Sequence, residues 1–237
     1  MSVSRLDKIL CDSGLYTRSE ARRLIKSGCV KASGLVVTSP DTRLDELGSE
    51  ILVSGVSLRL GRERYFMLNK PEGVLSATED SEQKTVLDLF PAEFAGLGLF
   101  PVGRLDKDTS GLLLITNDGD FSHRITSPKH HIQKTYETYV DGSLTDKDAS
   151  AFAEGITLRD ETKCLPARLE IDSEDSSHAW VSVFEGKYHQ VKRMLASVGK
   201  PVLKLKRISI GGLSLDENLE PGQFRELTPE EKSALFT

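Results

Sequence analysis

The chain has 237 residues, of which 38% are hydrophobic, and a formal net charge of −5. This length fits one large domain or two small ones. The longest apolar runs, such as residues 112–115, are far shorter than the roughly 20 residues that cross a bilayer. Residues 1–7 lack the apolar stretch of a secretory signal, and the three cysteines are isolated, without metal-ligand spacing. We therefore expect a reduced, cytoplasmic protein with no membrane association and no bound metal.

The charges are segregated along the chain, so the negative total is misleading. One short N-terminal stretch carries Arg18, Arg22, Arg23, Lys26 and Lys31. A later segment, between Glu185 and Asp216, contains no acidic residue and carries Lys187, Lys192, Arg193, Lys200, Lys204, Lys206 and Arg207. Local basic patches attract phosphate groups whatever the total charge. A nucleic-acid partner is therefore compatible with this composition.

The first 60 residues predict a small module of two helices and short strands. Leu6, Ile9 and Leu10 fall on one face of a first helix. Thr17 stands three residues before Glu20, the spacing of a capping box that begins a second helix. Short β-branched stretches follow at 29–31, 35–38 and 51–53. We expect a domain over residues 1–60, a charged linker over 59–64, and a second domain over 61–237.

The second domain predicts mixed secondary structure with few long helices. It opens with an apolar strand over 65–70 that stops at a proline. The patterns predict helices over 83–89, 118–127, 146–154 and 190–197. They predict strands over 112–116, 134–140, 167–171, 179–183 and 202–210. Since regular alternation of strands and helices is missing, the expected fold class is α+β, with a largely antiparallel sheet.

A polar loop over residues 103–111 is the most informative segment, because it runs directly into an apolar strand. Such a loop presents Asp106 and Asp108 at the edge of a rigid element, which suits a catalytic carboxylate. The structural alternative is a turn whose Asp and Ser side chains bind local backbone groups. Spacing alone leaves both interpretations open.

Two further segments bear on the choice between these interpretations. Residues 134–137 place Tyr136 in a strand, just after a basic run over 127–131. Residues 185–195 form a glycine turn that opens a helix, from which Lys192 and Arg193 project. Taken singly, a tyrosine is more often a packing residue, and a Lys-Arg pair is more often solvated surface.

Together these segments resemble the pseudouridine synthases that act on ribosomal RNA. Residues 70–71 are similar to that family's first motif, 103–112 to its catalytic-aspartate motif, 134–136 to its aromatic motif and 186–194 to its basic motif. Residues 122–128 resemble the small-subunit branch in particular. Residues 1–60 resemble the αL (S4-like) RNA-binding module shared with a small-subunit ribosomal protein. Four motifs in this order are highly specific, and the resemblance covers nearly the whole chain.

The resemblance implies a role for each matching residue. Asp106 would be the catalytic carboxylate, Tyr136 would stack on the flipped uracil and help remove its C5 proton, and Lys192 would pair with Asp106. Substrate contacts would come from Arg104, Arg193, Arg18, Arg22, Arg23 and Lys26. Moving C1′ from N1 to C5 of uracil involves no redox change, so we expect no cofactor. The expected partner is ribosomal RNA, of the small subunit and in naked or partly assembled form, bound by a monomer.

Two other functions fit parts of the sequence. Residues 106–109, Asp-Lys-Asp-Thr, are close to the D-x-D-x-T pattern of Mg²⁺-dependent phosphohydrolases, in which the first Asp attacks phosphate, although the Thr stands one position early. That fold places its carboxylates after a buried parallel strand, whereas here the loop precedes the apolar strand. The second alternative is a non-catalytic RNA-binding or ribosome-assembly protein that uses its N-terminal module alone.

Overall fold

The computed structural model describes residues 3–13, 16–45, 49–58 and 63–237. The chain forms two compact units, one of Met1–Arg64 with Phe90–Leu99 and one of Tyr65–Leu89 with Phe100–Thr237. The predicted boundary between residues 60 and 61 lies outside the described residues. No helix in the described ranges has the length and apolar character that a bilayer span requires.

The first unit packs two short helices against small sheets, as its apolar pattern predicts. Helix α1 spans Leu6–Asp12 and α2 spans Arg18–Lys26. The predicted capping box is present, since Thr17 Oγ1 accepts from the Glu20 amide and Glu20 Oε2 accepts from the Thr17 amide. The strands are β1 (Val3–Arg5), β4 (Arg43–Asp45), β2 (Val30–Ala32), β3 (Leu35–Val36), β5 (Ile51–Val53) and β6 (Val56–Leu58), paired as β1-β4 and β3-β2-β5-β6. The helices bury Leu6, Ile9, Leu10, Ala21 and Ile25.

The second unit is built on one mixed sheet with strand order β11-β12-β10-β13-β9-β7-β15. The strands are β7 (Tyr65–Lys70), β9 (Ser110–Thr116), β10 (Lys134–Val140), β11 (Arg168–Ile171), β12 (His178–Val183), β13 (Val202–Ile210) and β15 (Phe224–Glu226). Short strands β8 (Phe100–Pro101) and β14 (Leu213–Ser214) pair with β9 and β13. All described pairings are antiparallel except that of β13 with β9. The predicted α+β class is confirmed.

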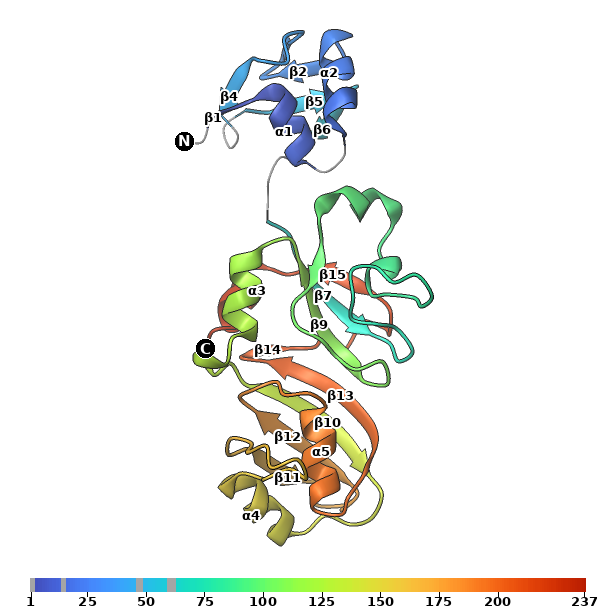
Figure 1. Ribbon diagram of the computed structural model, residues 1–237, viewed down its shortest axis with the longest axis vertical. Helices are drawn as coiled ribbons and strands as arrows, with labels where there is room; N and C mark the ends of the chain where they lie inside the picture. The colour runs from blue at the N-terminus through green and yellow to red at the C-terminus, as the bar shows by residue number, and fades with distance from the viewer. Residues whose placement is uncertain (1–2, 14–15, 46–48, 59–62) are drawn as a thin grey trace. The chain divides into compact units, whose positions relative to one another are not determined.

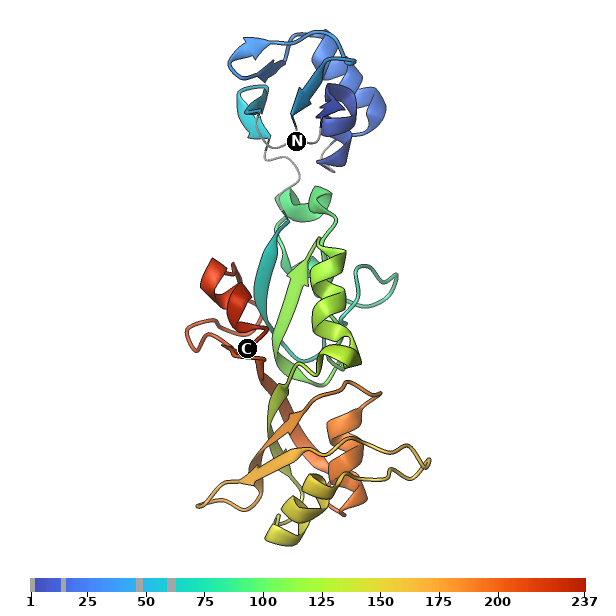
Figure 2. The ribbon, with the colours of Figure 1, turned by 90° about the vertical axis from the view of Figure 1, so that its left-hand side faces the viewer.

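Helices cover each half of this sheet separately. Helix α3 (Gly119–Thr126) packs Phe121 and Ile125 against apolar side chains of β7 and β9 (Figure 2). Helices α4 (Asp146–Glu154) and α5 (Gln190–Ser197) pack against β11 and β12 in a second core (Figure 1). A last helix, α6 (Pro229–Ala234), begins at a Thr228–Glu231 capping box that the sequence analysis overlooked.

The two halves join where β9 begins beside β13, and this junction requires a glycine. Gly111 has φ +101°, and a Cβ there would lie 2.2 Å from the Arg207 carbonyl oxygen. A side chain at this position would therefore push β9 away from β13. The close approach matters for the site, because the loop that carries Asp106 leads directly into β9.

The predicted helix over 83–89 is wrong. Only a 3-10 turn, η1 (Leu87–Leu89), forms there. The preceding residues instead pair with Leu75, whose amide donates to the Lys84 carbonyl and whose carbonyl accepts from the Val86 amide. Thr85 is fixed by the Asp88 carboxylate, which accepts from its amide and hydroxyl. Tertiary pairing has overridden the local preference of this segment. A second 3-10 helix, η2, spans Ala92–Leu97.

Candidate active site

A buried lysine binds the backbone of the loop between β8 and β9. Lys70, at the end of β7, is completely buried. Its ammonium donates to the carbonyl oxygens of Pro71 at 3.0 Å, Asp106 at 3.1 Å and Thr109 at 2.9 Å. Burial lowers the pKa of Lys70 to about 8. The side chain therefore fixes the backbone on both sides of Asp106.

The Asp106 carboxylate, on the loop before β9, contacts two basic side chains, one on α5 and one directly before α5. Lys192 Nζ, from α5, lies 3.0 Å from Asp106 Oδ2, so the predicted ion pair is present. His189 Nε2 lies 3.3 Å from Asp106 Oδ1. Lys192 also contacts Asp108 Oδ1 at 2.5 Å. Burial acts to lower the pKa of Lys192, but its hydrogen bonds to Asp108 and Asp106 outweigh burial and raise it.

Asp106 and Asp108 differ in exposure although they are two residues apart. The Asp106 side chain is 28% exposed and faces the junction, whereas the Asp108 side chain is 75% exposed. The hydrogen bond from Lys192 lowers the pKa of Asp108. Asp108 thus acts as an outer partner that keeps Lys192 charged and extended toward the loop.

A cavity of about 820 Å³ opens beside this cluster. Its walls are the 103–109 loop, β10, the turn before α5 and β13, and they include Arg104, Asp106, Tyr136 and Lys192. The structure therefore brings together these four residues of the sequence prediction, which lie up to 88 positions apart in the chain. A uridine removed from its stack would fit a space of this size.

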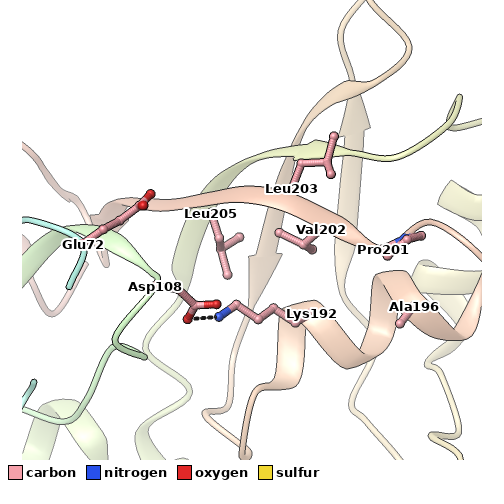
Figure 3. A pocket seen from close by; sticks show the side chains of 8 residues that line it. All are labelled: Glu72, Asp108, Lys192, Ala196, Pro201, Val202, Leu203 and Leu205. Carbon is pink, nitrogen blue, oxygen red and sulfur yellow. Dashed lines mark hydrogen bonds and ion pairs between the residues drawn. The ribbon is translucent and has the colours of Figure 1, made fainter. Parts of the chain in front are cut away.

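A smaller cavity of about 300 Å³ shares Asp108 and Lys192 with the larger one. Figure 3 shows Asp108 and Lys192 facing each other on one side of it and Val202, Leu203 and Leu205 on the other. The ion pair thus borders both spaces. The apolar side of the smaller cavity belongs to β13.

Arg193 does not line either cavity. It follows Lys192 on α5, so its side chain leaves the helix about 100° further round. Its guanidinium forms an ion pair with Asp160 at 2.5 Å. The ion pair joins the 160 loop to α5, and the contact of Arg193 with substrate stays a prediction.

The N-terminal basic cluster lies on the exposed side of α2. Arg18, Arg22, Arg23 and Lys26 are all exposed. Arg22, however, donates through Nε to Asp7 at 3.0 Å, and Asp7 is buried. The hydrogen bond from Arg5, with another from Arg22, lowers the pKa of Asp7. Arg22 therefore has a structural partner within its own unit.

Sequence reasoning missed three residues of the larger cavity. His189 has a left-handed backbone, φ 48°, directly before α5, and its ring stacks on that of Tyr188 with centroids 3.8 Å apart. Lys134 and Arg207 enter the cavity from β10 and β13. Lys134 lies two positions before Tyr136, and this period of two was a usable signal. Nothing in the sequence indicated that β13 would bring Arg207 beside β10.

Comparisons with known proteins relate this chain to a protein family. Residues 64–197 match the family model of RNA pseudouridylate synthases, and residues 4–51 match that of the S4 domain. The chain belongs to the RNA pseudouridylate synthase family. It is 45% identical to a ribosomal small subunit pseudouridine synthase A of Vibrio cholerae, covering 98% of this chain and 99% of the relative. It is 44% identical to an uncharacterised RNA pseudouridine synthase of Bacillus subtilis, covering 96% of each chain.

A crystal structure of a pseudouridylate synthase has the same fold, with a TM-score of 0.69 and 41% identity over 98% of this chain and 99% of that one. The protein is thus an RNA pseudouridine synthase with an N-terminal S4 domain. The likeness of residues 106–109 to the D-x-D-x-T pattern is coincidental. The strand after it, β9, runs antiparallel to β7 and follows the carboxylates instead of preceding them.

Proposed function

We propose that this pseudouridine synthase modifies a uridine of small-subunit ribosomal RNA, with Asp106 as its catalytic carboxylate. The placement of Asp106 carries the assignment of the site. Its carboxylate borders the cavity, its backbone is anchored by Lys70, and its charge is balanced by Lys192. The RNA class is supported by the relatives that are 41–45% identical over nearly the whole chain, several of which are ribosomal small subunit pseudouridine synthases.

The reaction breaks the C1′–N1 bond of uridine and forms a C1′–C5 bond. The C1′–N1 electron pair leaves with the base, the base turns, C5 joins C1′, and the C5 proton is lost. Asp106 acts at the nucleotide through its carboxylate. Lys192 balances the negative charge of that carboxylate across an ion pair of 3.0 Å. No electron acceptor or outside nucleophile enters this sequence.

Tyr136 serves as the platform for the uracil and as an aid in removing the C5 proton. It belongs to β10 and lines the same cavity as the loop of Asp106. Stacking on an aromatic ring stabilises the bound base by roughly 1–3 kcal/mol, which offsets part of the free energy of unstacking the nucleotide. Arg104 lines the same cavity and is exposed, so it suits a phosphate of the displaced strand.

The S4 domain contributes affinity through phosphate contacts. Its exposed α2 cations, Arg18, Arg23 and Lys26, carry charge but form no base-reading arrangement. Arg22 adds charge to the same face while it holds Asp7. We infer that this domain positions the RNA and that the second unit selects the uridine.

The decisive experiment maps pseudouridine in total RNA from cells with the gene, without it, and with an Asp106→Asn copy. We expect one or more small-subunit RNA positions to lose the modification in both altered strains and to regain it with the wild-type gene. Purified protein tested on naked RNA and on partly assembled subunits then identifies the form of the substrate. Loss of sites confined to transfer RNA or large-subunit RNA would contradict the proposed substrate.

A further inference from the structure

Two basic side chains line the large cavity beside Tyr136. Lys134 and Tyr136 are two positions apart on β10, and Tyr136 is the Cα partner of Arg207 on β13. All three line the cavity. This group comes from β10 and β13, whereas Asp106 comes from the 103–109 loop and its partners His189 and Lys192 come from the start of α5.

Arg207 is buried without a matching acid. It is 5% exposed, donates through Nε to the Leu112 carbonyl at 2.8 Å, and places Nη1 3.5 Å from Tyr136 Oη. Its Nη2 is buried and lacks a hydrogen-bond partner among the described residues. A buried charge that is left unpaired is strongly destabilising. An acceptor on a ligand in the cavity would satisfy this donor.

Lys134 adds a second cation to this group. Its ammonium donates to the Ile125 carbonyl at 3.2 Å, which leaves further N–H donors. Burial, with a further contribution from the positive charge of Arg207, lowers the pKa of Lys134 to about 8. Within the described part of the chain, no ion pair joins Lys134 or Arg207 to an acidic side chain.

We propose that Lys134 and Arg207 bind the carbonyl edge of the target uracil and stabilise the negative charge that the base acquires when the C1′–N1 bond breaks. This inference rests on the proposed roles of Asp106 and Tyr136. The electron pair of the broken bond moves onto N1 and is shared with O2 and O4 of the ring. Donors fixed in a dry site stabilise such a charge far better than water does.

The burial of Arg207, which acts together with Lys134, favours the base over a phosphate as their ligand. Arg207 is nearly fully buried and contacts the hydroxyl of Tyr136, so it lies at the level of the stacked ring. A phosphate of a continuous RNA strand needs an exposed cation, which Arg104 supplies. The same donors disfavour cytosine, because it presents an amino group where uracil presents O4. The pair thus contributes to the choice of uridine as well as to its reaction.

The test uses the full-length protein and compares two RNA substrates whose target bases differ as leaving groups. Single-turnover consumption is measured on RNA that carries either uridine or 5-fluorouridine at the target, since fluorine stabilises the departing anion. Lys134→Met should slow uridine consumption about 10- to 100-fold, the range expected for a hydrogen bond to a charged group. The slowing on 5-fluorouridine should be several-fold smaller. Lys134→Arg should recover part of the rate, and Lys147→Met, an exposed lysine of α4 outside both cavities, should match wild type.

Arg207→Gln should show the same dependence on the leaving group, and circular dichroism and thermal unfolding verify that it folds. Equal slowing on both substrates would overturn the proposal. A fall of about 0.7 in the salt slope of RNA binding with an unchanged rate would also overturn it, because that result identifies a phosphate contact. The proposed function fails separately: in that case wild-type protein would leave small-subunit RNA unmodified, or Asp106→Asn would remain active.

Discussion

Replacing Lys70 by methionine should disable the loop of Asp106. The substitution keeps the length of the side chain but removes three hydrogen bonds from the ammonium to the carbonyl oxygens of Pro71, Asp106 and Thr109. Hydrogen bonds from a charged group contribute about 1.5–3 kcal/mol each. Because the pKa of Lys70 is lowered from 10.5 to about 8, keeping this ammonium charged in the folded protein has a net cost of about 3.4 kcal/mol relative to the unfolded chain. The net loss of stability should therefore be about 1–6 kcal/mol.

The loss of activity should exceed the loss of folded protein. Asp106 sits on the backbone that Lys70 anchors, and a shift of about 1 Å in a catalytic group can cost about 100-fold in rate. Urea unfolding gives the free energy, and single-turnover pseudouridine formation, measured where the variant is fully folded, gives the rate. Lys84→Met, at an exposed position, is the matched control. Wild-type stability and rate in Lys70→Met would refute the anchoring role.

The pH dependence gives a second readout of Lys70. Its folded-state pKa of about 8 lies below the unfolded value of 10.5, so the charged form is disfavoured by folding. Between these values unfolding takes up a proton, and the contribution of Lys70 to stability rises with pH. The difference in unfolding free energy between wild type and Lys70→Met should change by about 2 kcal/mol in favour of wild type from pH 8 to pH 10. An unchanged difference would show that Lys70 titrates normally.

Three further predictions concern the site and the S4 domain. Asp106→Asn should abolish turnover with RNA affinity nearly unchanged, while Asp108→Asn, on a largely exposed side chain, should be much milder; the reverse order would reassign the carboxylate. Tyr136→Phe should slow loss of tritium from C5 and keep RNA binding, and Tyr136→Leu should be slower still because stacking is lost; wild-type rates in both would remove Tyr136 from the site. Arg23→Ala combined with Lys26→Ala should lower the salt slope of RNA binding by about 1.4–1.8, and an unchanged slope would exclude phosphate contacts by α2.

Local sequence patterns were sufficient to predict most of the helices and strands. The predicted bounds of α4, α5, β10, β13 and β5 agree with the structure, because each has a clear apolar period and a turn or cap at its ends. The helix predicted over 83–89 failed because Leu75, some ten residues earlier, pairs with that backbone. A period within a short window contains no information about such a partner.

The sequence motifs likewise identified the family, Tyr136 as a residue of the site, and the pairing of Asp106 with Lys192. They could do so because the residues of the site lie within short local motifs. Only the tertiary structure showed that Lys70 lies beneath the Asp106 loop, that His189 contacts Asp106, and that Arg193 turns away to Asp160. It also brought Arg207 beside Tyr136, through a strand pairing that spans 71 residues of chain. Such contacts depend on sheet order and register, which arise from packing over the whole unit and leave no local signal in the sequence.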